Sequence, residues 1–296
     1  MNNIEKIYNE PLSKHSTFKI GGCARVAYFP KNKGEFVEVV RHLKNEGEKY
    51  FVVGNGSNLL FDDKGFDGAI IFTKNMAECQ YTYNSDGVVI YAEAGKKLTE
   101  LSLEAGKKHA LAGLEFAYGI PATIGGAIYM NAGAYGGQMA DVVLDVEAYD
   151  VDKNEIVTID NKSADFSYRH SIFEENKNLI VLSVRLKLML GDAMEIATKM
   201  DTNMQARRDK QPLEFPSAGS TFKRPLGYFA AKLIDDAELK GYTVGGAKVS
   251  EKHAGFVINA GGATCADVLT LMQDVSSIVK EKFGVELSPE VIYLPY

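Results

Sequence analysis

The chain has 296 residues, of which 46% are hydrophobic and 24% charged, so it can form two or three domains that each bury a core. Its net charge of −6 argues against a nucleic-acid-binding protein, because such proteins usually carry a basic face. The three cysteines form no CxxC pair, which favours a reducing, cytoplasmic compartment. The N-terminal segment MNNIEKIYNEPLSKHSTF lacks the apolar core of a secretory signal, and no apolar run of about 18 residues predicts membrane insertion.

The first two thirds of the chain mix helical and strand patterns. Phe36, Val40 and Leu43 recur at helical spacing and predict a helix over 35–47. A second helix is predicted over 98–109. Strands are predicted over 50–53, 69–72, 88–92, 142–151, 156–159 and 179–190, with a turn at 152–154.

The last third is richer in helices, predicted over 193–208, 225–238 and 264–283, with short strands over 256–258 and 291–294. The longest helix has a capping box in Thr264 and Asp267, and its buried stripe consists of Val268, Met272, Val275 and Val279. Pattern changes near residues 77 and 191 predict boundaries there and so divide the chain into 1–77, 78–190 and a third part that begins at 191.

A short glycine-containing loop directly follows the strand predicted at 50–53. Its glycines allow the backbone to approach a phosphate, and its amides and polar side chains can donate to one. It matches neither the Rossmann fingerprint nor a P-loop, so it is either a phosphate-binding loop or a tight turn. The residues are Gly54, Asn55, Gly56, Ser57, Asn58 and Leu59.

A second stretch, 119–137, contains six glycines among small apolar residues. A disordered linker would be polar, so we expect this segment to be ordered, packed either against a flat ligand or against other elements. Its candidate ligand-binding residues are Gly119, Ile120, Pro121, Thr123, Gly125, Gly126, Ala127, Asn131, Gly133 and Ala134.

Four further segments accompany these two stretches: 16–22 (STFKIGG), 168–173 (YRHSIF), 219–223 (GSTFK) and 253–259 (HAGFVIN), followed by Pro289-Glu290-Val291. Together they resemble the UDP-N-acetylenolpyruvoylglucosamine reductase family nearly from end to end. The length and the compact region 168–190 resemble the shorter subtype of the family. That subtype lacks a tyrosine-bearing loop over the substrate.

The resemblance implies an α+β fold, with a two-part FAD-binding module of the vanillyl-alcohol-oxidase (PCMH) type and a smaller α+β substrate-binding domain. The two parts of the module would be 1–77, joined by the final strand 288–296, and 78–190, and the substrate-binding domain would be 191–287. It implies a flavin-dependent oxidoreductase that reduces the enolpyruvyl ether of UDP-N-acetylglucosamine to UDP-N-acetylmuramate in peptidoglycan precursor synthesis. NADPH is the implied hydride source and FAD carries the hydride. FAD is expected to be non-covalent, since the loop Gly54–Leu59 contains no histidine.

The same resemblance implies roles for three side chains. Arg169 would grip the substrate carboxylate, because its planar guanidinium can bind a carboxylate in two places. Glu290 would stabilise the enol form at that end of the substrate. Ser220 would donate the proton to the carbon next to the carboxylate, because an enolate is basic enough to take a hydroxyl proton.

Basic residues are candidates for the diphosphate groups, and surface solvation is the equal alternative for each: Lys223, Arg224, Arg207 and Arg208. The family often has Asn at the position of Arg224. The five histidines show no HxxxH or HxH spacing, so no metal site is predicted, and His253 is interpreted as structural. Two other functions stay open, a flavin oxidase of the same superfamily and a UDP-sugar transferase or binding protein without redox chemistry. A flavin absorption band separates the latter from the reductase.

Overall fold

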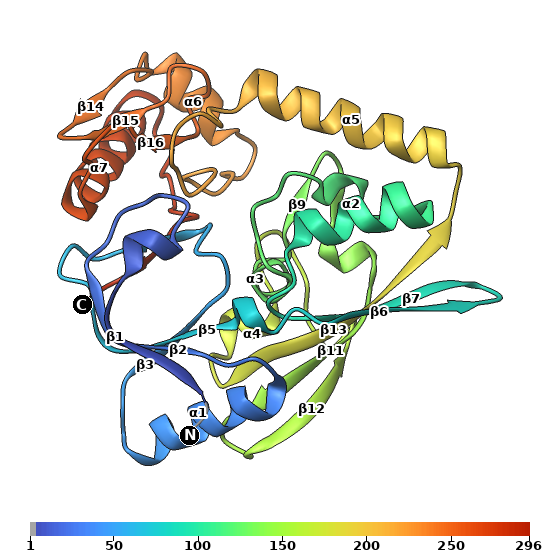
Figure 1. Cartoon of the computed structure of the whole chain (residues 1–296). Helices are drawn as coiled ribbons and strands as arrows, with labels where there is room; N and C mark the ends of the chain where they lie inside the picture. Colours follow the sequence, from blue (N-terminus) through green and yellow to red (C-terminus); the bar gives the residue numbers. More distant parts are fainter. Residues whose placement is uncertain (1–3) are drawn as a thin grey trace. The chain divides into compact units, whose positions relative to one another are not determined.

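A computed structural model of the chain describes residues 4–296 (Figure 1). The chain divides into two compact units. The first comprises Met1–Ile7, of which residues 4–7 are described, together with Ala27–Asn55 and Ala69–Ala206. The second comprises Tyr8–Val26, Gly56–Gly68 and Arg207–Tyr296.

A four-stranded sheet has the order β1-β2-β5-β3, formed by β1 (Glu5–Pro11), β2 (Cys23–Phe29), β5 (Phe66–Phe72) and β3 (Tyr50–Val53). The strands predicted at 50–53 and 69–72 are therefore confirmed, and β3 pairs in parallel with β5, Tyr50 opposite Ala69. The helix predicted at 35–47 is α1 (Lys33–Asn45). It begins after Asn32, whose side chain accepts a hydrogen bond of 2.9 Å from the amide of Glu35.

The core of the first unit covers an antiparallel sheet of order β12-β11-β13-β7-β6. Alternate residues of β7, Val88, Ile90 and Ala92, are fully buried, as expected for a strand that presents one face to a core. The strands are β6 (Cys79–Asn84), β7 (Gly87–Glu93), β11 (Val143–Asp150), β12 (Glu155–Asp160) and β13 (Leu179–Leu190), with β8 (Leu111–Ala112) paired to β13. The predicted turn at 152–154 joins β11 and β12.

Helices α2 (Leu98–His109) and α3 (Ile124–Tyr129) contribute buried side chains to the same core. The helix predicted at 98–109 is confirmed, whereas α3 lies inside the glycine-rich stretch, where no helix was predicted. The remaining elements here are α4 (Ile172–Glu175), α5 (Ala193–Lys210), the short strands β9 (Gly133–Ala134) and β10 (Gly137–Gln138), and 3₁₀ helices at Thr73–Asn75, Glu115–Ala117 and Met139–Asp141.

The second unit packs α7 (Cys265–Phe283) and α6 (Ala230–Asp236) with a sheet of order β14-β15-β16 around its own core. The predicted capping box is present: the Thr264 hydroxyl accepts from the amide of Asp267, and the Asp267 carboxylate accepts from that of Thr264. The predicted stripe on α7 is also buried. The other elements are β14 (Thr243–Val244), β15 (Ala247–Val249), β16 (Val257–Asn259) and a 3₁₀ helix at Leu12–His15.

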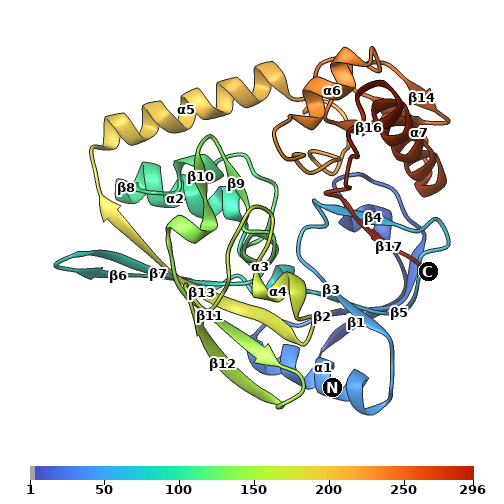
Figure 2. The same ribbon diagram turned by 180° about the vertical axis from the view of Figure 1, so that it is seen from behind.

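The chain ends in β17 (Ile292–Leu294), which pairs in parallel with β4 (Leu59–Phe61). Figure 2 shows the two strands side by side. Residue Leu59, the last of the predicted phosphate loop, lies opposite Ile292. The final strand of the sequence is thereby fixed to the strand that begins where that loop ends.

The helix predicted over 225–238 is wrong in its first turn, because α6 begins only at Ala230. Gly227 has a φ of +76°, a left-handed conformation that a right-handed helix cannot contain. The apolar residues Leu226 and Phe229, which recur at helical spacing, are 99% and 62% exposed. The segment before α6 is instead a loop with an apolar surface.

Among residues 4–296, no helix combines the length and the hydropathy needed to cross a membrane.

Candidate functional site

Within the first unit, the two glycine-containing segments lie against each other. A Cβ atom on Gly54 would lie 2.1 Å from Oγ1 of Thr123, so only glycine fits there without a shift of the Thr123 side chain. The side-chain amide of Asn55 donates a hydrogen bond of 2.6 Å to the carbonyl oxygen of Pro121. The start of the predicted phosphate loop thus packs on the start of the glycine-rich stretch.

The next glycine of the loop is fixed within the second unit. Gly56 has a φ of +60°, and a Cβ there would lie 2.1 Å from the carbonyl oxygen of His15. Its own carbonyl accepts from the amide of Thr17 at 3.4 Å, and the Thr17 hydroxyl donates to the carbonyl of Ser217 at 2.7 Å. The segment 16–22 therefore links the phosphate loop to the loop that leads to Ser220.

Packing explains several glycines of the 119–137 stretch. A Cβ on Gly137 would lie 2.6 Å from the Phe116 ring, and one on Gly125 would lie 3.0 Å from Cβ of Ala94. Gly119 and Gly136 have φ angles of +89° and +83°, which favour glycine for conformational reasons. These positions need no ligand to account for them.

Gly126 has no such explanation. It lies exposed in α3, and a Cβ there would meet only Oγ1 of Thr123 at 3.7 Å, an ordinary contact. Gly126 lies in the first turn of α3, and helical backbone favours alanine over glycine by up to about 1 kcal/mol, so the protein alone favours alanine at this position. A flat group such as the isoalloxazine ring of FAD, lying against the backbone of α3, explains the glycine, so the residues present fit that cofactor.

The side chain of Asn131 is occupied by the protein itself. Its Nδ2 donates to Oε1 of Gln138 at 3.1 Å and to the carbonyl oxygen of Ser167 at 2.9 Å. Its Oδ1 accepts from the amide of Ala140 at 2.9 Å. The buried amide therefore ties the glycine-rich stretch to the loop that precedes Arg169.

Arg169 stands at the tip of a tight turn in the first unit. Ser167 and His170 exchange backbone hydrogen bonds of 3.2 Å, and Arg169 has a φ of +55° between them. Its Nη2 donates to the carbonyl oxygen of Gly133 at 3.2 Å, and its Cζ lies 5.2 Å from the centre of the Tyr168 ring. The half-buried guanidinium is thereby oriented beside the predicted flavin-binding stretch.

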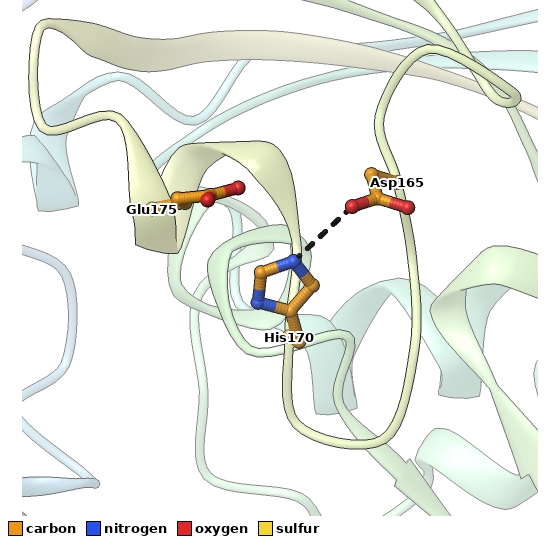
Figure 3. Close-up of side chains that lie close together, drawn as sticks. All are labelled: Asp165, His170 and Glu175. Atoms are coloured by element: carbon orange, nitrogen blue, oxygen red, sulfur yellow. Dashed lines mark ion pairs between the residues drawn. The ribbon is translucent and has the colours of Figure 1, made fainter.

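A cluster next to this turn, Asp165, His170 and Glu175, has ligand atoms within 4.8 Å of one another (Figure 3). His170 forms an ion pair of 3.4 Å with Asp165 through Nε2, and another of 3.4 Å with Glu174 through Nδ1. The two carboxylates of the cluster are exposed. The histidine spacing in the sequence gave no signal for this group, because it is assembled from one histidine and carboxylates of a loop and of α4.

In the second unit, the segment after Ser220 pairs with the Pro289-Glu290 motif. Phe222 forms an antiparallel bridge with Pro289. The amide of Glu290 donates to the carbonyl of Thr221, and the amide of Lys223 donates to the carbonyl of Ser288, both at 2.8 Å. Proline has no amide hydrogen, and it occupies the position of this pairing that needs none. The segments that contain Ser220 and Glu290 are therefore brought side by side.

Asn58 of the predicted phosphate loop also holds Glu290. Its side-chain amide donates to the carbonyl of Glu290 at 3.0 Å, and its own carbonyl accepts from the amide of Ile292 at 2.9 Å. The backbone of Glu290 is thus fixed on one side by Asn58 and on the other by Thr221. Sequence reasoning missed both contacts, since each joins residues far apart in the chain.

The basic candidates are in different environments. The Arg224 guanidinium lies 4.8 Å from the centre of the exposed Phe229 ring. Arg207 is 7% exposed, and its Nη1 donates to Oε1 of Gln211 at 3.1 Å. Lys223 is half-buried. The backbone carbonyl of Arg208 accepts a hydrogen bond of 2.7 Å from Nζ of Lys252.

His253 is held by its own loop. Its Nδ1 accepts from the amide of Gly255 at 3.1 Å, and its ring packs edge-on against Phe256. Burial lowers the pKa of His253 below its ordinary value, so the ring is neutral at pH 7. This agrees with a structural histidine.

Comparisons with known proteins match both parts of the chain. Residues 24–160 match the family described as FAD binding domain, and residues 211–294 match the family described as UDP-N-acetylenolpyruvoylglucosamine reductase, C-terminal domain. The predicted combination of a FAD-binding module with a smaller α+β domain is therefore confirmed. A solvent-stable cholesterol oxidase shares the fold over 64% of this chain and 39% of its own, with a TM-score of 0.51 and 14% identity.

Relatives named UDP-N-acetylenolpyruvoylglucosamine reductase extend over almost the whole chain. The protein from Caldanaerobacter subterraneus is 50% identical over 97% of this chain and 93% of its own, and that from Lachnoclostridium phytofermentans is 46% identical over 96% and 91%. The crystal structure of the Thermus caldophilus reductase has a TM-score of 0.81 and 34% identity over 99% of each chain. The chain therefore belongs to the UDP-N-acetylenolpyruvoylglucosamine reductase family.

Proposed function

We propose that this protein is an NADPH-dependent flavoenzyme that reduces the enolpyruvyl ether of UDP-N-acetylglucosamine to UDP-N-acetylmuramate, a precursor of peptidoglycan. The observation that carries the proposal is the pairing of residues 221–223 with 288–290, which brings the Ser220 segment beside Glu290. A hydroxyl and a carboxyl on neighbouring segments suit the protonation of an enol or enolate next to a carboxylate.

The substrate accumulates negative charge toward its carboxylate as the double bond is reduced. We assign the stabilisation of that charge to Arg169, whose guanidinium stays protonated throughout and can form two parallel hydrogen bonds with a carboxylate. Its backbone turn and its bond to Gly133 hold the side chain in one orientation. Glu290 stabilises the enol form by hydrogen bonding.

Ser220 donates the proton at the carbon next to the carboxylate. It follows Gly219, which has a φ of +77° and no heavy atom within 4 Å of a Cβ built there. The hydroxyl is half-exposed in a loop whose next residue is tied down by hydrogen bonds. A serine hydroxyl is a weak acid, and it can act here because an enolate is a much stronger base than water.

FAD, when bound, accepts hydride from NADPH and supplies it to the terminal carbon of the enolpyruvyl group. We propose that the loop Gly54–Leu59 and the stretch Gly119–Ala134 hold it non-covalently, with the open backbone at Gly126 facing the flavin. The basic side chains Lys223, Arg224 and Arg207 are proposed for the diphosphate of the substrate.

For the organisation of these sites, we propose that residues 1–77 with 288–296, and 78–190, form the two parts of the FAD module. Residues 191–287 then form the substrate-binding domain. We place the enzyme in the cytoplasm, where its three free cysteines would stay reduced.

The proposal is tested by an absorption spectrum of the purified protein, followed by two anaerobic half-reactions. We expect a flavin band that acid precipitation removes from the protein, bleaching of that band by NADPH, and its return on addition of the enolpyruvyl UDP-sugar. A protein without the band after FAD addition would instead be a UDP-sugar transferase or binding protein. Re-oxidation by oxygen, without a response to the enolpyruvyl UDP-sugar, would identify an oxidase.

A further inference from the structure

Thr221, the residue after Ser220, joins three segments of the second unit. Its amide donates to the carbonyl of Gly255 at 2.9 Å, and its carbonyl accepts from the amide of Glu290 at 2.8 Å. Its hydroxyl accepts from the amide of Val257 at 2.9 Å. The side chain is 2% exposed, so water does not replace these bonds.

These contacts leave Ser220 little freedom relative to Glu290. The amide and hydroxyl of Thr221 fix it to residues 255–257, which run into β16 of the core sheet. Its carbonyl fixes the backbone of Glu290, whose own carbonyl is held by Asn58. A change at the Thr221 hydroxyl therefore alters the position of Ser220 relative to Glu290, although the Thr221 side chain is itself buried.

We propose that Thr221 is a positioning residue that sets the geometry of Ser220 against Glu290. The inference rests on the proposed function, because it explains the relative position of Ser220 and Glu290, the two residues proposed to act on the substrate. It predicts that the Thr221 hydroxyl matters for protonation of the reduced substrate and has no influence on the transfer of hydride from NADPH to FAD.

The test compares Thr221→Val with Thr221→Ser. Valine has the shape of threonine and no acceptor, so the amide of Val257 loses its buried partner. Serine retains the acceptor. Because misplacement of a reacting group by about 1 Å can slow a reaction about 100-fold, we expect Thr221→Val to slow flavin re-oxidation by the enolpyruvyl UDP-sugar about 10- to 100-fold.

Three further measurements should distinguish a displaced Ser220 from a general loss of structure. In Thr221→Val the rate of flavin reduction by NADPH and the Kd of the UDP-sugar should stay within about twofold of wild type, while hydrogen exchange at the Val257 amide becomes faster. Thr221→Ser should restore both re-oxidation and protection of that amide. If Thr221→Val fails to fold, Thr221→Cys replaces it, since a thiol keeps a similar size and is a weak acceptor.

Ser250→Ala is the matched control. Ser250 is 1% exposed in the same unit, and its hydroxyl accepts from the amides of Lys252 and His253 at 3.2 and 3.3 Å. Neither of these two hydrogen bonds of the Ser250 hydroxyl involves the Ser220 segment or Glu290. We expect Ser250→Ala to lower the melting temperature comparably and to leave re-oxidation unchanged.

Re-oxidation of Thr221→Val at the wild-type rate, or slowed only as much as in Ser250→Ala, would overturn the inference. Failure of the proposed function has a different signature, because the wild-type protein itself would then not be re-oxidised by the enolpyruvyl UDP-sugar.

Discussion

Nη2 of Arg169 donates a hydrogen bond of 3.2 Å to the carbonyl oxygen of Gly133. The side chain proposed to bind the substrate carboxylate is thereby oriented by the backbone of the stretch proposed to bind the flavin. The same stretch holds the Arg169 turn a second time, through the bond from Asn131 to the carbonyl of Ser167. The residues proposed for the cofactor and the residue proposed for the substrate carboxylate are thus held by the same short piece of backbone.

Replacing Arg169 with lysine should lower kcat/KM for the enolpyruvyl UDP-sugar about 100-fold, since lysine keeps the charge and loses the planar pair of donors. Steady-state kinetics with NADPH in excess measure this. Arg185→Lys is the control, because Arg185 lies on β13 of the same unit and pairs with Asp145 at the surface. Equal kinetics for wild type and Arg169→Lys would remove Arg169 from the site.

Replacing Gly126 with alanine should have opposite effects on the apoprotein and on FAD binding. The apoprotein should gain about 1 kcal/mol in unfolding free energy from helix propensity. A methyl group against the flavin should weaken FAD binding about tenfold, as expected for an overpacked contact. Urea unfolding of the apoprotein and a fluorescence titration with FAD measure the two effects.

Gly125→Ala provides the contrast, since its Cβ would lie 3.0 Å from that of Ala94 and should destabilise the apoprotein. Unchanged FAD affinity in Gly126→Ala would mean that no ligand lies against α3.

Ser220→Ala should leave the reduction of FAD by NADPH intact and slow the second half-reaction about 10²- to 10⁴-fold, the range that a positioned proton donor contributes. Stopped-flow absorbance follows both steps. Ser217→Ala tests the same loop without removing the proposed donor, because Thr17 binds the carbonyl of Ser217 and not its side chain. Turnover of Ser220→Ala at the normal rate would contradict the assignment.

Asp267→Asn should make stability less sensitive to acid. Hydrogen bonds from the amides of Thr264 and Gly246 hold the pKa of Asp267 below its ordinary value of 3.8. The ionised carboxylate therefore stabilises the folded protein above about pH 4, and this contribution is lost as the pH falls further. Urea unfolding from pH 7 to pH 3 should show a smaller loss for Asp267→Asn than for wild type.

The matched control is Glu281→Gln, which removes one exposed negative charge near the other end of α7. Parallel pH curves for wild type and Asp267→Asn would show that the capping carboxylate does not couple folding to protonation.

Local signals predicted much of this structure. The α7 helix carries its own start, buried stripe and end in sequence, with Thr264 as its N-cap and Gly284 at its C-cap. The predicted start of α6 is wrong because Leu226 and Phe229, apolar residues at helical spacing, indicate a helix where the backbone does not form one. Gly227 between them adopts a left-handed conformation, which the sequence pattern does not reveal. Strand β1 gave no signal, since most of its residues are exposed and no alternation results.

For the candidate site, the sequence predicts which residues take part but not how they are held in place. Motif resemblance selected Ser220 and Glu290, but the hydrogen bonds that place them come from Thr221 and Asn58. These bonds depend on backbone groups of residues distant in sequence, and no local pattern of polar or apolar residues specifies such partners. The same holds for Asn131, a candidate cofactor-binding residue whose side chain binds three protein groups.

The pairing of β17 with β4 has a consequence for synthesis. Asn58 and Glu290, joined beside this pairing, are 232 residues apart, so in a growing chain the predicted phosphate loop lacks this partner until residues 288–294 have been synthesised. Closing so large a loop carries an entropic cost that the pairing must offset. A nascent chain that has not reached residue 294 therefore lacks the strand beside Glu290, and folding of the second unit cannot be completed before that strand has been made.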